Sequence, residues 1–297
     1  MSKLDAKTDI DRISMEVLRS SKSLDVFPTP VDRILKFADL IVRKDIDISK
    51  IHPSYKDRAN DFLRNALSKV RGIFDFSHRE IYLDLSQHEN RKNFVKLHET
   101  AHGILPWQKK VQAIIADNDH TLNPDHCEEF EAEANYFASV TLFQHDRFMK
   151  ELKRLDLSID AAMHLAKHFG GSIHAALRRY VDCSLNKCAL LILDNIERGK
   201  NTTCNLKTYV ASLKFEKAFG AVLFSPRLEF SHPFVQDFCF GRRYKKGGRA
   251  TLETKDGSVE FAYQFFNNSY NAFVLLHPVG EVKRSRTTFI IKDLSSI

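Results

Sequence analysis

Cysteine is scarce in this chain of 297 residues, and the few cysteines form no recognisable framework. The five are Cys127, Cys183, Cys188, Cys204 and Cys239. They are odd in number and widely scattered, which argues against a small secreted domain held together by disulfides. Cys183 and Cys188 lack the spacing of a zinc-ribbon pair. We interpret these cysteines as buried thiols, and a redox-sensitive pair is the alternative.

Long hydrophobic runs are also absent. No stretch of roughly eighteen apolar residues occurs, so the sequence predicts no transmembrane helix and no membrane partner. Residues 1–5 are charged and lack the apolar core of a signal peptide, which favours a cytoplasmic protein. Repeats and low-complexity segments are missing. The hydrophobic fraction of 43% is enough to form the cores of two modest domains.

The most informative motif is His-Glu-x-x-His at residues 98–102. Residues four apart lie on one face of a helix, so His98 and His102 can bind one metal ion. Glu99 can then reach a water on that metal without being a ligand. This arrangement suits Zn²⁺, which lowers the pKa of such a water to about 7. The alternative is a surface helix with two solvated histidines.

A third ligand is expected on a second helix, predicted over residues 128–139. Glu131 and Asn135 are four residues apart and share a face. Glu131 could bind the metal, and Asn135 could orient one of the histidines through its second ring nitrogen. The residues that compete with Glu131 for this role are Glu128, Glu129, Glu133, His120 and His126.

Two stretches of the sequence, His-Glu-Thr-Ala-His-Gly and Glu-Ala-Glu-Ala-Asn-Tyr-Phe-Ala-Ser, together resemble the ImmA/IrrE-type metallo-endopeptidases. The resemblance implies that His98, His102 and Glu131 bind zinc and that Glu99 is the general base. It covers residues 72–145 well and extends loosely to about 195. The chain departs from the family pattern at residues 139–144, which lack the usual proline, so its substrate preference is open.

The resemblance also implies a function, because members of this family typically cut or inactivate DNA-binding repressors. We therefore expect a zinc-dependent endopeptidase that cleaves a regulatory protein such as a repressor. The alternative is a zinc-stabilised regulator that binds DNA or a protein partner and cleaves nothing. The two hypotheses differ in whether Glu99 is needed.

The N-terminal part of the chain is expected to be a mainly helical, zincin-like domain with a short sheet. Upstream of the motif, residues 73–76 and 80–85 are predicted to form a hairpin, and in many zinc peptidases an edge strand in this position aligns the substrate. A loop is expected at 105–126. Helices are predicted over 3–22, 30–43, 55–69, 91–104, 127–143, 145–155, 159–169 and 173–181, and the whole segment 144–199 is expected to be helical. The pair at 159–181, joined at Gly-Gly-Ser with Ser172 as N-cap, predicts either simple helix packing or a helix-turn-helix that contacts DNA.

After residue 200 the pattern changes to short alternating runs with turn signals. Strands are expected at 219–224, 250–254, 258–265, 271–276 and 287–291. Asp256-Gly257 between two such runs is a hairpin signal. We therefore predict an α+β protein, with a metallopeptidase domain at 1–200 and a β-rich accessory domain at 201–297. A sensory or substrate-binding role for the second domain rests on analogy alone.

The formal charge is +7 and the excess is uneven. Residues 242–249 carry five positive charges and residues 283–286 add three. Each segment is either a solvated loop or a surface for an acidic partner such as nucleic acid.

Overall fold

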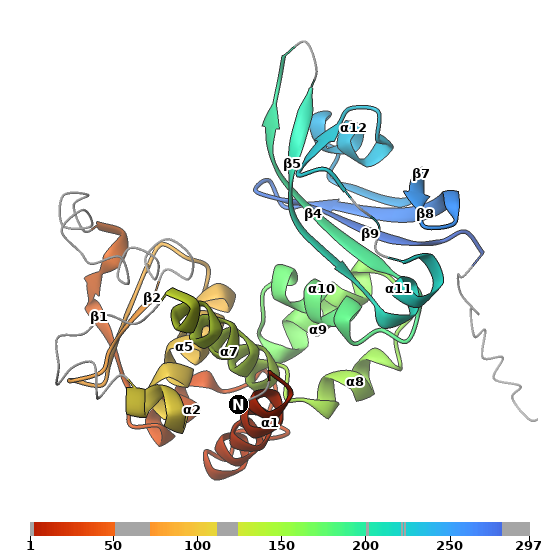
Figure 1. Ribbon diagram of the computed structural model, residues 1–297. Helices are drawn as coiled ribbons and strands as arrows, with labels where there is room; N and C mark the ends of the chain where they lie inside the picture. The colour runs from red at the N-terminus through yellow and green to blue at the C-terminus, as the bar shows by residue number, and fades with distance from the viewer. Residues whose placement is uncertain are drawn as a thin grey trace, which may run out of the picture. The chain divides into compact units, whose positions relative to one another are not determined.

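The computed structural model describes residues 3–50, 72–111, 124–199, 202–220, 222 and 224–280. The chain divides into two compact units (Figure 1). The first comprises Met1–Arg154 and Asp160–Tyr180, and the second comprises Leu155–Ile159 and Val181–Ile297. The first unit is mainly helical with a small sheet and the second is β-rich, so the predicted α+β fold class is confirmed.

The small sheet of the first unit contains β1 (Ile41–Asp47), β2 (Gly72–Asp75) and β3 (Glu80–Leu83). The strand order is β1-β3-β2, with β3 parallel to β1 and antiparallel to β2. The predicted hairpin is therefore present. Its second strand is central, however, and β2 rather than β3 forms the edge on the hairpin side.

Strand β1 takes up the last three residues of a predicted helix. The helix expected over 30–43 is α2 (Val31–Phe37), which ends before Asp39 takes a left-handed backbone conformation with φ 53°. The chain then turns into β1, where it pairs with β3. Apolar spacing alone could not separate the end of α2 from the β-branched Ile41 and Val42, because both fit a short amphipathic helix.

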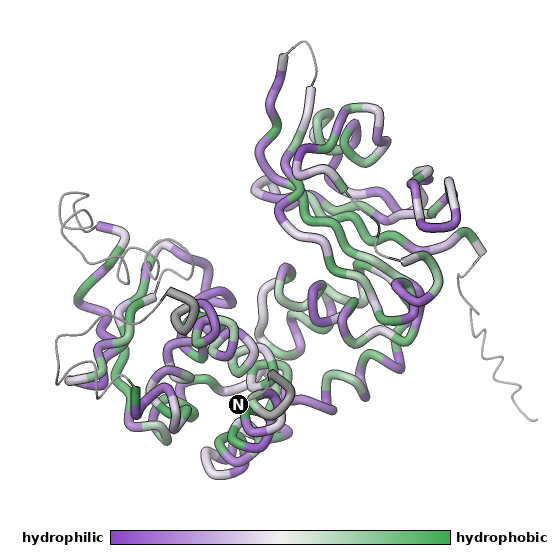
Figure 2. The backbone as a smooth tube through the Cα atoms, viewed as in Figure 1, coloured by the Kyte–Doolittle hydropathy of each residue, from purple (hydrophilic) through white to green (hydrophobic). Residues whose placement is uncertain are grey.

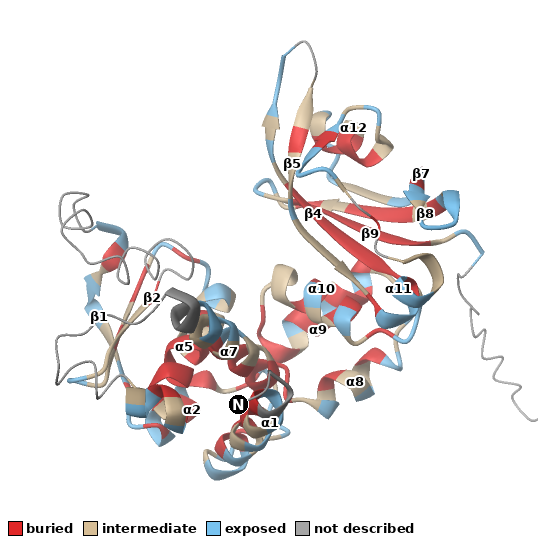
Figure 3. Cartoon of the chain, viewed as in Figure 1, coloured by how far each residue is buried: buried red, intermediate tan, exposed pale blue. Residues whose placement is uncertain are grey.

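Three helices form the core around the His-Glu-x-x-His motif: α1 (Lys3–Ser20), α5 (Glu89–Ile104) and α7 (Pro124–Leu142). Figure 3 shows buried residues along α5 and α7 where the two helices face each other. The buried cluster between the three helices consists of Ile10, Ala101, Leu105, Ala134, Phe137 and Val140. Both helices predicted to carry metal ligands are thus present and packed together.

The remaining helices of the first unit follow the predicted pattern. They are α8 (Asp146–Leu152), α9 (Ile159–Phe169) and α10 (Ile173–Asp182). Ser172 caps α10, because its hydroxyl accepts a hydrogen bond of 3.1 Å from the backbone N–H of Ala175. Residues 106–111 are helical, contrary to the expected loop. The helix predicted at 55–69 lies outside the described residues.

The second unit is built on an antiparallel sheet with the order β6-β5-β4-β9-β8-β7. Its strands are β4 (Ala189–Glu197), β5 (Thr203–Ala211), β6 (Arg227–Glu229), β7 (Tyr244–Thr254), β8 (Gly257–Asn267) and β9 (Ala272–Pro278). Helices α11 (Leu213–Phe219) and α12 (Pro233–Cys239) pack on one face, where Phe215 and Phe234 enter the core. Figure 2 shows the hydrophobic middle of this sheet in green.

Two predictions for this region are wrong. Residues 189–197 form β4 rather than a helix, and they belong to the second unit, the main part of which begins at Val181. The strand expected at 219–224 is not seen in the described part of that range, since Phe219 is the last residue of α11 and residues 220, 222 and 224 lie outside the strands. The strands at 250–254, 258–265 and 271–276 are confirmed within β7, β8 and β9. The strand at 287–291 lies outside the described residues.

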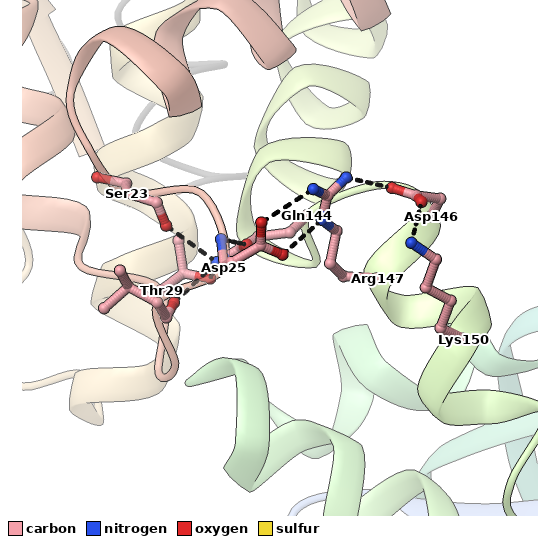
Figure 4. A network of polar contacts seen from close by, with 8 residues as sticks. Ser23, Asp25, Thr29, Gln144, Asp146, Arg147 and Lys150 are labelled. Atoms are coloured by element: carbon pink, nitrogen blue, oxygen red, sulfur yellow. Dashed lines mark hydrogen bonds and ion pairs between the residues drawn. The ribbon is translucent and has the colours of Figure 1, made fainter.

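A buried amide joins the turn after α7 to the loop after α1 (Figure 4). The side chain of Gln144 accepts a hydrogen bond of 2.8 Å from the backbone N–H of Asp25. Its Nε2 donates to the backbone oxygen of Val26 at 2.8 Å and to Thr29 Oγ1 at 3.0 Å. Nearby, Arg147 pairs with Asp25 at 2.7 Å on the surface.

We expect Gln144→Asn to lower the free energy of unfolding by about 1–3 kcal/mol, because the shorter amide leaves buried polar groups unpaired. Asparagine tolerates the left-handed backbone conformation of this residue, φ 48°, so backbone strain does not confuse the result. The control is Arg147→Ala, for which we expect a loss of about 0–1 kcal/mol because the pair with Asp25 faces solvent. Urea denaturation, monitored by circular dichroism, measures the free energy of unfolding of both variants. Equal losses of unfolding free energy in the two variants would contradict the prediction that the buried amide contributes more to stability than the surface ion pair.

Candidate metal centre

Helix α5 brings two histidines of the motif into the interior on one face. Their side chains are buried, with 1% of His98 and 6% of His102 exposed. Helix α7 adds Glu131, which is partly buried. Ligand atoms of these three residues lie within 4.8 Å of one another, and this is the single such group of histidine, cysteine and carboxylate side chains among the described residues.

Ligand atoms of the three residues form a compact group, which we call the ligand triangle because one residue stands at each corner. The Nε2 atoms of His98 and His102 are 3.2 Å apart. Glu131 places one carboxylate oxygen 3.3 Å from Nε2 of His98 and the other 3.5 Å from Nε2 of His102. In a regular tetrahedron with bonds of about 2.0–2.1 Å to Zn²⁺, neighbouring ligand atoms are about 3.3–3.4 Å apart. The separations between the three residues are therefore of the size found between zinc ligands.

The electrostatics of the cluster also favour a cation. For Glu131, burial acts to raise the pKa, but hydrogen bonds with His102 and His98 outweigh it and lower the pKa. For His102, burial acts to lower the pKa, but the hydrogen bond with Glu131 and the charges of Glu99 and Glu131 outweigh it and raise the pKa. An ionised carboxylate and two imidazoles facing one point are suitable ligands for a divalent metal ion.

Glu99 lies beside the cluster and points away from solvent. Its side chain is 4% exposed, and burial raises its pKa while the nearby His98 and His102 oppose the shift. The carboxylate sits against the backbone of β2, since a Cβ on Gly72 would be 2.6 Å from Glu99 Oε1. Only glycine at this position leaves room for the carboxylate where it now lies.

The structure does not bring Asn135 to either histidine. Asn135 is exposed on α7. The second ring nitrogen of His102 instead contacts Gln108, with 2.8 Å between Nδ1 and Oε1. Nδ1 of His98 is buried and has no hydrogen-bond partner among the described residues. Gln108 was not predicted from the sequence, because the segment that carries it was expected to be a loop.

The other residues that could have replaced Glu131 do not join the cluster. Glu128 and Glu129 are exposed. Glu133 accepts hydrogen bonds from Trp107 and from Gln108. His120 and the side chain of His126 lie outside what the structure describes.

Comparison with known proteins agrees with this geometry. Residues 45–180 match the profile of the IrrE N-terminal-like domain, the peptidase M78 family. The chain thus carries a domain of the ImmA/IrrE family, and the match ends at residue 180, where the first unit also ends. No curated protein shows significant sequence similarity to the chain.

One similar solved structure is that of a Mycobacterium tuberculosis transcriptional regulator. It is 13% identical, the similarity covers 96% of this chain and 82% of that one, and the TM-score is 0.55. At this identity the similarity concerns the fold alone. None of the helices in the described ranges is long and apolar enough to span a membrane.

The basic segment 242–249 is less available to a partner than its sequence indicates. Most of it lies in β7. Arg242 and Lys245 both pair with Asp237, at 2.7 and 2.9 Å, and Arg249 pairs with Glu260 at 2.8 Å. Residues 283–286 lie outside the described ranges. Binding of nucleic acid through these segments stays a prediction.

We expect His98→Ala and Glu131→Ala to lose most of the zinc that the wild-type protein retains, because each removes one corner of the ligand triangle. Glu129→Ala is the control, since its exposed side chain lies on the same helix as Glu131. Metal analysis of the purified variants by mass spectrometry gives the zinc content per chain. Full zinc content in Glu131→Ala would overturn the assignment of Glu131 and point to another ligand.

Proposed function

We propose that the chain is a zinc-dependent endopeptidase that cleaves a regulatory protein. The observation that carries this proposal is the ligand triangle of His98, His102 and Glu131 beside the buried carboxylate of Glu99. The peptidase family of the first unit supports it independently.

The proposed roles follow from the chemistry of each side chain. Zn²⁺ held by His98, His102 and Glu131 would supply Lewis acidity and lower the pKa of a water to about 7. Glu99 would take a proton from the attacking water and pass it to the amine that leaves. Burial suits this role, because it raises the pKa of Glu99 towards the range in which a carboxylate exchanges protons efficiently near neutral pH.

The substrate is proposed to bind in an extended form along β2. Among the described residues β2 pairs with β3 alone, which leaves its other edge for a further strand. A peptide that joins a sheet edge gains backbone hydrogen bonds. Gly72 in β2 touches Glu99, so a peptide on this edge would lie next to the proposed base.

A regulatory protein, such as a DNA-binding repressor, is the proposed substrate class. The family resemblance supports this, since its members typically cut or inactivate repressors. The similar Mycobacterium tuberculosis protein is a transcriptional regulator, and this supports a second candidate. In that candidate the chain is itself a zinc-stabilised regulator that binds DNA or a protein and cleaves nothing.

The variant Glu99→Gln separates the two candidates. We expect it to keep its zinc and its fold but to lose at least about 10²-fold in cleavage rate, the lower end of what a general base contributes. The measurement compares new protein N-termini, by mass spectrometry, in cells that express the wild type or the variant. Glu129→Gln is the matched control, because it neutralises an exposed glutamate.

N-termini that depend on Glu99 and persist in Glu129→Gln would establish peptidase activity. If the wild type and Glu99→Gln yield the same N-termini although both bind zinc, the endopeptidase is excluded and the non-proteolytic regulator is favoured.

A further inference from the structure

Gln108 is a fully buried side chain next to the candidate metal centre. It lies on the helical segment 106–111, directly after α5. Its Oε1 is 2.8 Å from Nδ1 of His102. Its Nε2 is 2.7 Å from Oε2 of Glu133 and 3.1 Å from the backbone oxygen of Phe130. Each end of the amide therefore has a different kind of neighbour.

These neighbours fix which way the amide points. Glu133 and the Phe130 carbonyl are both acceptors, so the amide NH₂ must face them, and a flipped amide would place its oxygen against two other oxygens. The amide oxygen must then face His102. An oxygen can only accept, so Nδ1 of His102 must carry the hydrogen.

The protonation of Nδ1 determines what Nε2 can do. In a neutral imidazole one nitrogen donates and the other carries a lone pair. With the hydrogen on Nδ1, the lone pair is on Nε2, which faces His98 and Glu131. This is the tautomer that a metal ligand bonded through Nε2 requires.

Glu133 holds the amide in turn. Its Oε2 accepts from Gln108 and, at 2.7 Å, from the indole N–H of Trp107. Trp107 packs against the buried cluster between α1, α5 and α7. Two neighbouring side chains on one helical segment thus donate hydrogen bonds to a single carboxylate on α7.

We propose that Gln108 and Glu133 are positioning residues that hold His102 in its Nδ1–H tautomer, with Nε2 directed at the metal centre. The inference deepens the proposed function, on which its metal-related part rests. It moves to Gln108 the role that was predicted for Asn135 from the sequence. Glu133 acts on His102 only through Gln108.

The first test reads the tautomer in metal-free protein, at a pH high enough that the His102 ring is neutral. The ¹⁵N shifts of the His102 ring nitrogens, assigned by comparison with His102→Ala, should show the hydrogen on Nδ1 in the wild type. In Gln108→Leu the acceptor is gone, and a mixture of tautomers is expected. Lys109→Leu is the control, because Lys109 is exposed on the same segment.

The second test measures zinc affinity by competition with a chelator. We expect Gln108→Leu to weaken zinc binding by about 10–100-fold, as is typical for loss of a partner behind a ligand histidine. Circular dichroism shows whether the variant is folded. Lys109→Leu should bind zinc as the wild type does.

A double variant keeps the proposal testable if the single variant does not fold. Gln108→Glu combined with Glu133→Gln exchanges the carboxylate and the amide across the same hydrogen bond. The carboxylate at 108 still accepts from His102, and the amide at 133 can still donate to it. We expect this variant to keep the Nδ1–H tautomer and most of the zinc affinity, whereas Gln108→Glu alone places two carboxylates together and should bind zinc more weakly than the double variant.

The proposal is overturned if Gln108→Leu keeps both the wild-type tautomer and the wild-type zinc affinity. The part that concerns Glu133 is overturned if Gln108→Glu alone binds zinc as tightly as the double variant does. It is also overturned if wild-type His102 carries its hydrogen on Nε2. The tautomer measurement needs neither metal nor activity. A wild type that binds zinc but cleaves nothing would therefore contradict the proposed endopeptidase and leave the role of Gln108 standing.

Discussion

The close packing of α5 against α7 is the constraint on which the site depends. The ligand triangle needs two histidines from one helix and a glutamate from the other. Their ligand atoms must be separated by about the distance between neighbouring ligands of one metal ion. Ala101 on α5 and Ala134 on α7 are both fully buried in the cluster between these helices. Small side chains allow helix axes to approach closely, and larger ones push them apart. The alanines therefore matter to the metal centre although they carry no polar atom.

The same packing places charged groups in the interior, which is unfavourable unless they are paired. Glu131 is balanced by the two histidines, and Glu99 is only partly balanced by them. Without a cation, two Nε2 atoms face each other at 3.2 Å, and at most one of them can donate to the other. With Gln108 directing the lone pair of His102 inward, a bound cation is the arrangement that satisfies every ligand atom. In the proposed zinc-bound form, binding of the ion would therefore also stabilise the folded protein.

The sequence identified the three side chains that lie together at the candidate site, because their placement follows from local geometry. Helical spacing alone places His98 and His102 on one face, and the second motif identifies a helix that carries Glu131. Asn135 was misassigned because helical spacing shows which residues share a face with Glu131 and does not show how α7 is rotated against α5. Gln108 was missed because its role depends on contacts with two helices at once, with His102 on α5 and with Phe130 and Glu133 on α7.

The fold shows the same division between local and long-range information. The helix at 173–181 and the hairpin around Asp256-Gly257 carry their own cap and turn, and they were predicted. The first residues of β1 and the whole of β4 were predicted as helix. Strand β1 pairs with β3, and β4 pairs with the distant β9 as well as with the neighbouring β5. Short apolar runs give no sign of the distant partners. Where pairing with a distant strand decides the structure, it overrides the local preference of the sequence for a helix or a strand.

The place of Trp107 has an optical consequence. It is the single tryptophan of the chain, and its indole N–H shares the carboxylate oxygen of Glu133 with Gln108, which in turn contacts His102. The emission of an indole responds to the polarity and hydrogen bonding around its N–H. The protein therefore has a fluorescent reporter linked through Glu133 and Gln108 to the His102 ring, and no other indole contributes to its emission. Binding of an ion at the candidate metal centre would be followed through that emission in the unlabelled chain.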